Sequence, residues 1–284
     1  MHRGARLLTV LAVAAALLTT AGCNKLKARD QLNKGIQSYK TGNYEQAINH
    51  FQEAVRLDSD LKVAKLYLAT AYAQQYVPGV DSPENATNAR LAIEEYTNVL
   101  KNDPENINSI KGIGYLYMNM KKWDEARQHY KKALAMDTND ADLYYSIGFI
   151  DWSQAYKDAA EIKAAAGMSV ETELKGKADQ KICDQIKAKD GAAVEEGMQM
   201  LQTAIDKRQD YDAAMAYLNL LYRRKANDMT CEDAQARADY IKSANVWIDK
   251  AMDARKRKAE ALAKKNQGGI VMETTPTPTA SPQK

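Results

Sequence analysis

The stretch "GNYEQAINHFQEAVRLD" (residues 42–58) returns in altered form as "KKWDEARQHYKKALAMD" (residues 121–137). Ala47 in the first copy aligns with Ala126 in the second, 79 residues further along the chain. Aromatic, small and acidic residues recur at matching places, as Tyr44 and Trp123, Ala54 and Ala133, and Asp58 and Asp137. Because self-similarity at a fixed spacing is typical of stacked repeats, the pair predicts a repeat protein.

A third copy gives the length of the repeat. The stretch "LAIEEYTNVLKNDP" (residues 91–104) aligns Ala92 with Ala126, which lies 34 residues later. Ala47 lies 45 residues before Ala92, which is one 34-residue period and 11 additional residues. The sequence therefore predicts a 34-residue unit with one short insertion between the first two copies.

Small and aromatic residues recur at helical spacing in both halves of each period. First-half examples are Leu68, Ala69 and Tyr72, then Ile113, Gly114 and Tyr117, then Ile147 and Gly148. Second-half examples are Ala47, Phe51 and Ala54, then Ala92 and Tyr96, then Ala126, Tyr130 and Ala133. This pattern resembles the tetratricopeptide repeat family, whose unit is a 34-residue helix–turn–helix. The resemblance implies an all-α, right-handed superhelical solenoid of about four to five units.

We expect the units near residues 28–61, 62–106, 107–140, 141–211 and 212–267. The 11 inserted residues fall between Tyr72 and Ala92, where we predict an enlarged loop. A larger insertion of about 37 residues, from Ser153 to Gly191, interrupts the fourth unit, since Gly148 and Gly197 occupy the signature places there. We predict one or two helical pieces within it, and a capping helix at the end of the last unit.

The N-terminus has the composition of a signal peptide. Residues 1–22 have a basic start, an apolar run and a small-residue end, and the run is shorter than the ~20 residues of a membrane span. The ending "TAGC" resembles a bacterial lipobox, which implies cleavage before Cys23, its acylation (palmitate) and a lipidated tether at 23–27. Asn24 then favours the outer membrane, facing the periplasm. The alternative is an ordinary signal peptide that leaves Cys23 as an incidental thiol.

The cysteine pair and the basic stretch near the C-terminus each allow two interpretations, and the last residues carry no signal of regular structure. Cys183 and Cys231 are an even pair in an exported chain, so they form either a disulfide or two buried thiols. The basic stretch 250–265 is either a solvated helix face or a contact for anionic lipid. Residues 268–284 are rich in Pro and Thr, and we expect them to be a disordered tail.

The sequence contains no recognisable catalytic constellation. Of the three histidines, His2 lies in the signal peptide, while His50 and His129 occupy the same place in separate repeats. A glycine-rich phosphate loop and a nucleophile elbow are both missing from the sequence. We therefore predict a non-enzyme without a cofactor or metal. The 40 Lys and Arg are nearly balanced by 37 Asp and Glu, so the net charge does not indicate a nucleic-acid partner either.

The resemblance implies a concave groove lined by the first helix of each unit. Carried onto this chain, the peptide-groove candidates are Tyr39, Lys111, Tyr115, Asn119, Tyr145, Phe149 and Trp152. Chaperone-binding members clamp a peptide carboxylate with Lys and Asn in the first unit, where this chain has Leu32 and Ile36. The alternative role for Trp152 is packing against the inserted segment.

These features predict a lipid-anchored envelope protein that acts as a non-enzymatic scaffold or adaptor for protein partners. The alternative is a binder of a cell-wall or anionic lipid ligand through the basic C-terminal helix. The sequence does not identify the partner.

Overall fold

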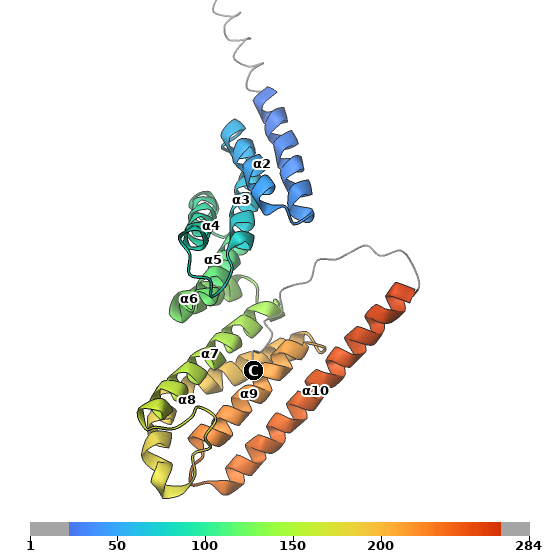
Figure 1. Cartoon of the computed structure of the whole chain (residues 1–284). Helices are drawn as coiled ribbons and strands as arrows, with labels where there is room; N and C mark the ends of the chain where they lie inside the picture. The colour runs from blue at the N-terminus through green and yellow to red at the C-terminus, as the bar shows by residue number, and fades with distance from the viewer. Residues whose placement is uncertain (1–22, 268–284) are drawn as a thin grey trace, which may run out of the picture. The chain divides into compact units, whose positions relative to one another are not determined.

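A computed structural model describes residues 23–267 of the chain (Figure 1). All regular secondary structure in this range is α-helical, as predicted. The chain divides into an N-terminal body, which ends at Leu143, and a C-terminal body, which begins at Tyr144. The predicted signal peptide at 1–22 and tail at 268–284 lie outside the described residues. No described helix has the length and apolarity that a membrane span requires.

The N-terminal body is a row of helices in which each packs on the next. It consists of a helix whose described part is 23–40, then α2 (Tyr44–Leu57), α3 (Lys62–Gln75), α4 (Pro83–Asn102), α5 (Ile107–Asn119) and α6 (Trp123–Met136). Residues 23–27, our predicted tether, are the first turns of the first helix. Leu26 is 72% exposed there, while Ala28 is fully buried. Packing of the first helix therefore begins directly after these residues.

Small signature residues allow paired helices to approach closely. A Cβ added to Gly35 would lie 2.4 Å from the ring of Phe51, and one on Gly114 would lie 3.2 Å from the ring of Tyr130. Ala47 and Ala126, the first matched pair in the sequence, are both completely buried. The repeat pattern thus marks the crossing points of the helices, where only a small side chain fits.

The first insertion forms a loop, as predicted, and also lengthens a helix. α4 has 20 residues, against 14 in α2 and 14 in α6. Ser82 caps its start by accepting a hydrogen bond from the backbone N–H of Asn85, and Pro83 occupies the first turn, where a missing N–H has no cost. Asn85 also bonds the backbone of Val77 and the carbonyl of Val80, which fixes the loop.

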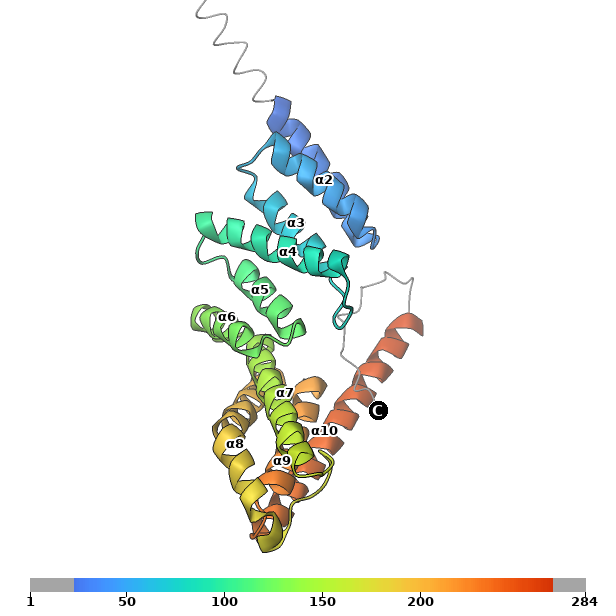
Figure 2. The same ribbon diagram turned by 60° about the vertical axis from the view of Figure 1, so that its left-hand side comes forward.

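The C-terminal body consists of long paired helices. They are α7 (Ala141–Ala165, which begins in the N-terminal body), α8 (Gly176–Lys207), α9 (Asp212–Met229) and α10 (Ala234–Gln267). The second insertion contains two helical pieces joined by a loop, and these pieces extend α7 to 25 and α8 to 32 residues. The chain has no proline between Pro104 and Pro276, so no proline interrupts these helices. Figure 2 shows α7 and α8 lying alongside each other, joined by a loop.

A disulfide joins the inserted part of α8 to the turn between α9 and α10. The structure connects Cys183 and Cys231, whose Cα atoms are 6.3 Å apart. Backbone hydrogen bonds continue this link, since the N–H of Gly176 donates to the carbonyl of Cys231 and that of Leu174 donates to the carbonyl of Asn227. The long hairpin is therefore fixed to α9 at its far end.

A buried ion network fixes the same hairpin from inside. Lys163 is completely buried, and its ammonium donates to Asp228 (2.5 Å) and to the carbonyls of Val170 (2.9 Å) and Thr172 (2.7 Å). Arg224 donates to the other oxygen of Asp228 at 2.9 Å. An ammonium has three N–H donors, and all three are used here, which is the condition under which a buried charge is tolerated.

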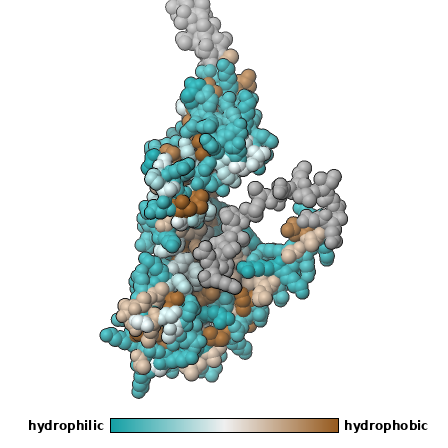
Figure 3. All heavy atoms as spheres, in the orientation of Figure 1, coloured by the Kyte–Doolittle hydropathy of each residue, from teal (hydrophilic) through white to brown (hydrophobic). Residues whose placement is uncertain are grey.

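The apolar residues lie mostly inside each body. The largest fully buried side chains include Phe51, Ile110, Leu116, Leu143, Ile147, Ile150 and Leu201. On the face shown in Figure 3, hydrophilic residues cover most of the described surface, with apolar residues in small groups. Half-buried aromatic residues are therefore more informative about function than isolated exposed aliphatic ones.

Candidate functional site

Four aromatic residues form a stripe along α7. They are Tyr145, Phe149, Trp152 and Tyr156, at intervals of four, three and four residues. This spacing places them on one face of a helix. Each is half-buried, and neighbouring rings lie 6.3, 6.2 and 5.5 Å apart in that order. The stripe continues into the inserted part of α7.

Two tyrosines extend the stripe into a wall. Tyr217 of α9 lies 4.9 Å from Phe149 and 4.9 Å from Trp152, both edge-on, and Tyr211 lies 5.0 Å from Tyr145. Burial among these rings raises the pKa of Tyr217. We call this set the aromatic wall: Tyr145, Phe149, Trp152, Tyr156, Tyr211 and Tyr217.

The wall includes three of our seven groove candidates. Tyr145, Phe149 and Trp152 lie together in it, while sequence reasoning missed Tyr156, Tyr211 and Tyr217. Tyr156 could have been found, because it continues the helical spacing of the stripe. Tyr217 could not, since its position depends on how α9 lies against α7.

Trp152 contacts aromatic rings both inside and outside the inserted segment. Its neighbours are Phe149 and Tyr217 of the wall and Tyr156 in the inserted segment. Arg224 places its guanidinium 5.3 Å from the centre of the Tyr156 ring. Trp152 therefore packs against the inserted segment and also belongs to the aromatic wall.

The other four candidates belong to the N-terminal body. Tyr39 packs on Tyr44 at 5.3 Å, and burial is the main cause of its raised pKa. Lys111 is ion-paired with Asp140 at 2.5 Å, and Asn119 donates to the backbone carbonyl of Tyr115. Among the four, Tyr115 is the most exposed, at 37%. The structure does not gather these four into one site.

His50 and His129 each form a contact at hydrogen-bond distance within the N-terminal body. The Nδ1 atom of His50 lies 2.7 Å from the side-chain oxygen of Gln31, and that of His129 lies 2.9 Å from the carbonyl of Glu125. Within residues 23–267, no group of three or more His, Cys, Asp or Glu side chains could hold a metal ion. Neither histidine contributes to the aromatic wall.

A buried carboxyl pair lies between α7 and α8. Asp158 and Asp190 share a hydrogen bond, and Lys189 lies 3.0 Å from Asp158. Burial, followed by the negative charge of Asp158, raises the pKa of Asp190 to about 7. A buried carboxyl beside a second negative charge ionises less readily than one in water. We therefore expect the stability of the hairpin to depend on the ionisation of Asp190.

The chain is similar to known repeat proteins in two segments. Residues 28–61 match the family described as tetratricopeptide repeat, and residues 114–154 match one described as TPR repeat. Over 119 residues the chain is 29% identical to the DnaJ homolog subfamily C member 7 homolog of Schizosaccharomyces pombe. That match takes in 41% of this chain and 23% of the relative, so the chain matches less than a quarter of the relative's length.

Solved structures of MamA have a similar fold. One described as MamA 41-end from Desulfovibrio magneticus RS-1 has a TM-score of 0.53 at 16% identity, covering 81% of this chain and 96% of that chain. A second crystal structure of MamA protein has a TM-score of 0.53 at 14% identity, covering 89% and 98%. At such identities the likeness concerns the fold alone. The repeat matches and these structures together show that the chain is an all-α solenoid of tetratricopeptide repeats.

Proposed function

We propose that this protein is a lipid-anchored scaffold of the bacterial cell envelope, which binds a protein partner against the aromatic wall. The observation that carries the proposal is the wall itself, formed by rings of α7, by Tyr211 before α9 and by Tyr217 of α9. Tyrosine and tryptophan are enriched in the centres of protein interfaces because they bury a large area with few torsions to restrict.

The arrangement of the wall supports binding without large rearrangement. Its rings stand on packed helices and contact one another, so little side-chain freedom remains to be lost when a partner binds. Leu32 and Ile36 occupy the places of the Lys and Asn that clamp a carboxylate in chaperone-binding members. We therefore propose an internal segment of a partner, rich in apolar side chains, as the bound element.

The proposed lipid anchor is at Cys23. This cysteine is free and exposed, and it lies at the first described position of the first helix. Acylation there would attach the membrane anchor directly to the first repeat. Two or more acyl chains, at ~0.8 kcal/mol for each buried CH₂, would make the attachment stable. Mass spectrometry of the mature N-terminus tests this part of the proposal, and an unmodified Cys23 would refute it.

The scaffold function is tested by capture of partners from detergent-solubilised envelope. We expect Tyr145→Ala combined with Phe149→Ala to reduce capture of specific partners at least tenfold. A matched control is Tyr222→Ala, which removes a half-buried tyrosine of α9 that pairs with Tyr240 outside the wall. Both variants must keep the wild-type far-UV circular dichroism spectrum. Equal capture by the double variant and the control would refute binding at the wall.

Binding of anionic lipid through residues 250–265 is a weaker second candidate. In its favour, every side chain from Arg255 to Lys265 is exposed. Against it, Arg255 and Lys258 are ion-paired with Asp212 at 2.8 and 2.7 Å. Co-sedimentation with phosphatidylglycerol vesicles tests this candidate. A Lys256→Gln, Lys264→Gln, Lys265→Gln variant of the unacylated chain that binds as well as its parent would refute it.

A further inference from the structure

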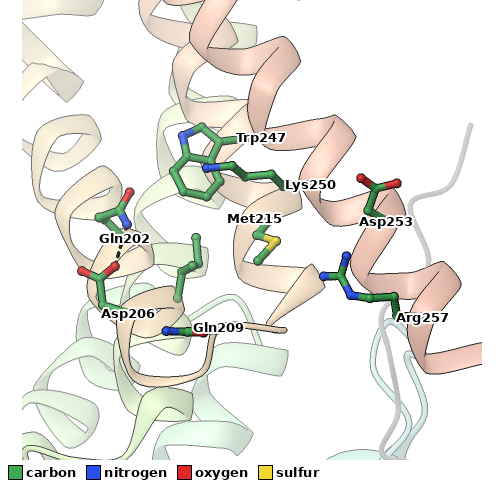
Figure 4. A pocket seen from close by; sticks show the side chains of 9 residues that line it. Gln202, Asp206, Gln209, Met215, Trp247, Lys250, Asp253 and Arg257 are labelled. Carbon is green, nitrogen blue, oxygen red and sulfur yellow. Dashed lines mark hydrogen bonds between the residues drawn. The ribbon is translucent and has the colours of Figure 1, made fainter. Parts of the chain in front are cut away.

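An open pocket of about 530 Å³ lies where α8 ends and α9 begins, against the side of α10 (Figure 4). Its lining consists of Gln202, Ile205, Asp206, Gln209, Met215, Trp247, Lys250, Asp253 and Arg257. None of these residues belongs to the aromatic wall. The volume falls within the range of ~300–1,000 Å³ that is typical of small-ligand sites.

The apolar part of the pocket has an aromatic ring and an aliphatic floor. Trp247 is half-buried, while Ile205 and Met215 are buried at 6% and 4% exposure. The ammonium of Lys250 lies 4.1 Å from the centre of the Trp247 ring. Lys250 is itself exposed, on a flexible stem, so a ligand with an apolar face can displace it from the ring.

The polar part carries both donors and acceptors without a net charge. Asp206 and Asp253 balance Lys250 and Arg257, and Figure 4 shows Asp206 on α8 across the pocket from Asp253 and Arg257 on α10. Asp206 accepts a hydrogen bond from Gln202 at 2.9 Å.

Three of the lining side chains have hydrogen-bonding capacity to spare. Within the described residues, Gln209, Asp253 and Arg257 make no hydrogen bond or ion pair with another side chain or with the backbone. Asp253 and Arg257 are one helical turn apart on α10, and yet they are not paired with each other. Their donors and acceptors are therefore available to a ligand at no loss of an internal bond.

This combination selects against strongly charged ligands. A phosphate would meet Asp206 and Asp253, and an organic cation would meet Lys250 and Arg257. A neutral ring with one apolar face and several hydroxyl groups satisfies every part of the lining. We propose that the pocket binds a neutral carbohydrate, with the C–H face of one pyranose ring on Trp247 and its hydroxyls on Asp253, Arg257 and Gln209. This second binding site is independent of the proposed scaffold function.

Tryptophan fluorescence of the purified full-length chain tests the proposal. The protein has three tryptophans, so Trp123→Phe with Trp152→Phe leaves Trp247 as the reporter. The probes are chitotetraose and cellotetraose, each titrated to about ten millimolar. We expect a saturable change in Trp247 emission with at least one of them. By calorimetry, Trp247→Ala should weaken the binding at least tenfold, while Trp247→Phe keeps part of it because a ring remains.

Two control variants distinguish binding in the pocket from binding at the aromatic wall and from an effect of unfolding. Trp152→Phe alone, with Trp247 intact, should bind each oligosaccharide as tightly as wild type. Asp253→Asn changes an exposed side chain and should weaken binding several-fold with an unchanged melting temperature. The proposal is overturned if neither oligosaccharide changes Trp247 emission, or if Trp247→Ala binds like wild type. Binding that is lost on Trp152→Phe instead would place the carbohydrate at the wall and overturn the assignment to the pocket.

Discussion

Replacing Asp190 with Asn should change how the stability of the C-terminal body depends on pH. Asp190 is 2% exposed, it shares a hydrogen bond with Asp158, and its pKa is raised to about 7. In the unfolded chain an Asp titrates near ~3.9. Between these two pKa values, the folded protein keeps the proton on Asp190 while the unfolded chain has lost it.

The sign of the effect follows from this proton. The stabilisation from the bound proton is complete below pH ~4 and is lost as the pH rises through about 7. The pKa difference is about 3 units, and at ~1.36 kcal/mol per unit the upper bound is ~4 kcal/mol. Lys189 beside Asp158 compensates part of the negative charge that acts on Asp190, so we expect ~2–4 kcal/mol.

The assay is urea unfolding followed by tryptophan fluorescence at several pH values. Trp123→Phe serves as the background, so that the signal comes from the C-terminal body. We expect Asp190→Asn to be more stable than its parent by ~2–4 kcal/mol at pH 8, and by less at each lower pH down to 5. The matched control is Asp184→Asn, an exposed acid on the same helix. If the difference between variant and parent stays constant from pH 5 to 8, the pKa of Asp190 is not raised and the reasoning fails.

Two further predictions concern packing and the buried ion network. Gly148→Ala should destabilise the C-terminal body by ~1–3 kcal/mol in thermal unfolding, because the new Cβ would lie 2.6 Å from the side chain of Leu201. Gly191→Ala is the control: its Cβ would lie 3.7 Å from the side chain of Lys187, an ordinary contact, so it should be neutral or stabilising. Lys163→Met should cost ~3–5 kcal/mol in urea unfolding by leaving Asp228 without its ammonium partner, and Asp228→Asn in that variant should recover part of the loss.

The repeat fold could be predicted because its decisive residues are small and regularly spaced. Ala47, Ala92 and Ala126 report a helix crossing whatever surrounds them, since a larger side chain would separate the helices. The form of the second insertion could not be predicted in the same way. Most of its residues favour helix, so the sequence does not say whether they form new helices or extend α7 and α8. Long-range contacts decide that, among them the pair of Lys163 with Asp228, 65 residues apart.

The candidate site was predicted along a single helix but not between helices. The spacing of Tyr145, Phe149 and Trp152 places them on one face of α7, and they do lie together. Lys111, another groove candidate, is paired with Asp140, 29 residues away. Helical periodicity carries no information about such partners.

The insertion determines where the aromatic wall ends. Tyr156, the last ring of the stripe, lies within the inserted part of α7, and a regular 34-residue repeat would stop before it. Arg224 packs on this ring and is oriented by Asp228, which Lys163 holds in turn. Buried charges of this kind rarely add net stability compared with apolar residues of the same size. Their consequence here is geometric, because they fix the hairpin and with it the position of Tyr156. The regular repeat residues therefore set how the helices stack, while the irregular residues set the extent of the wall.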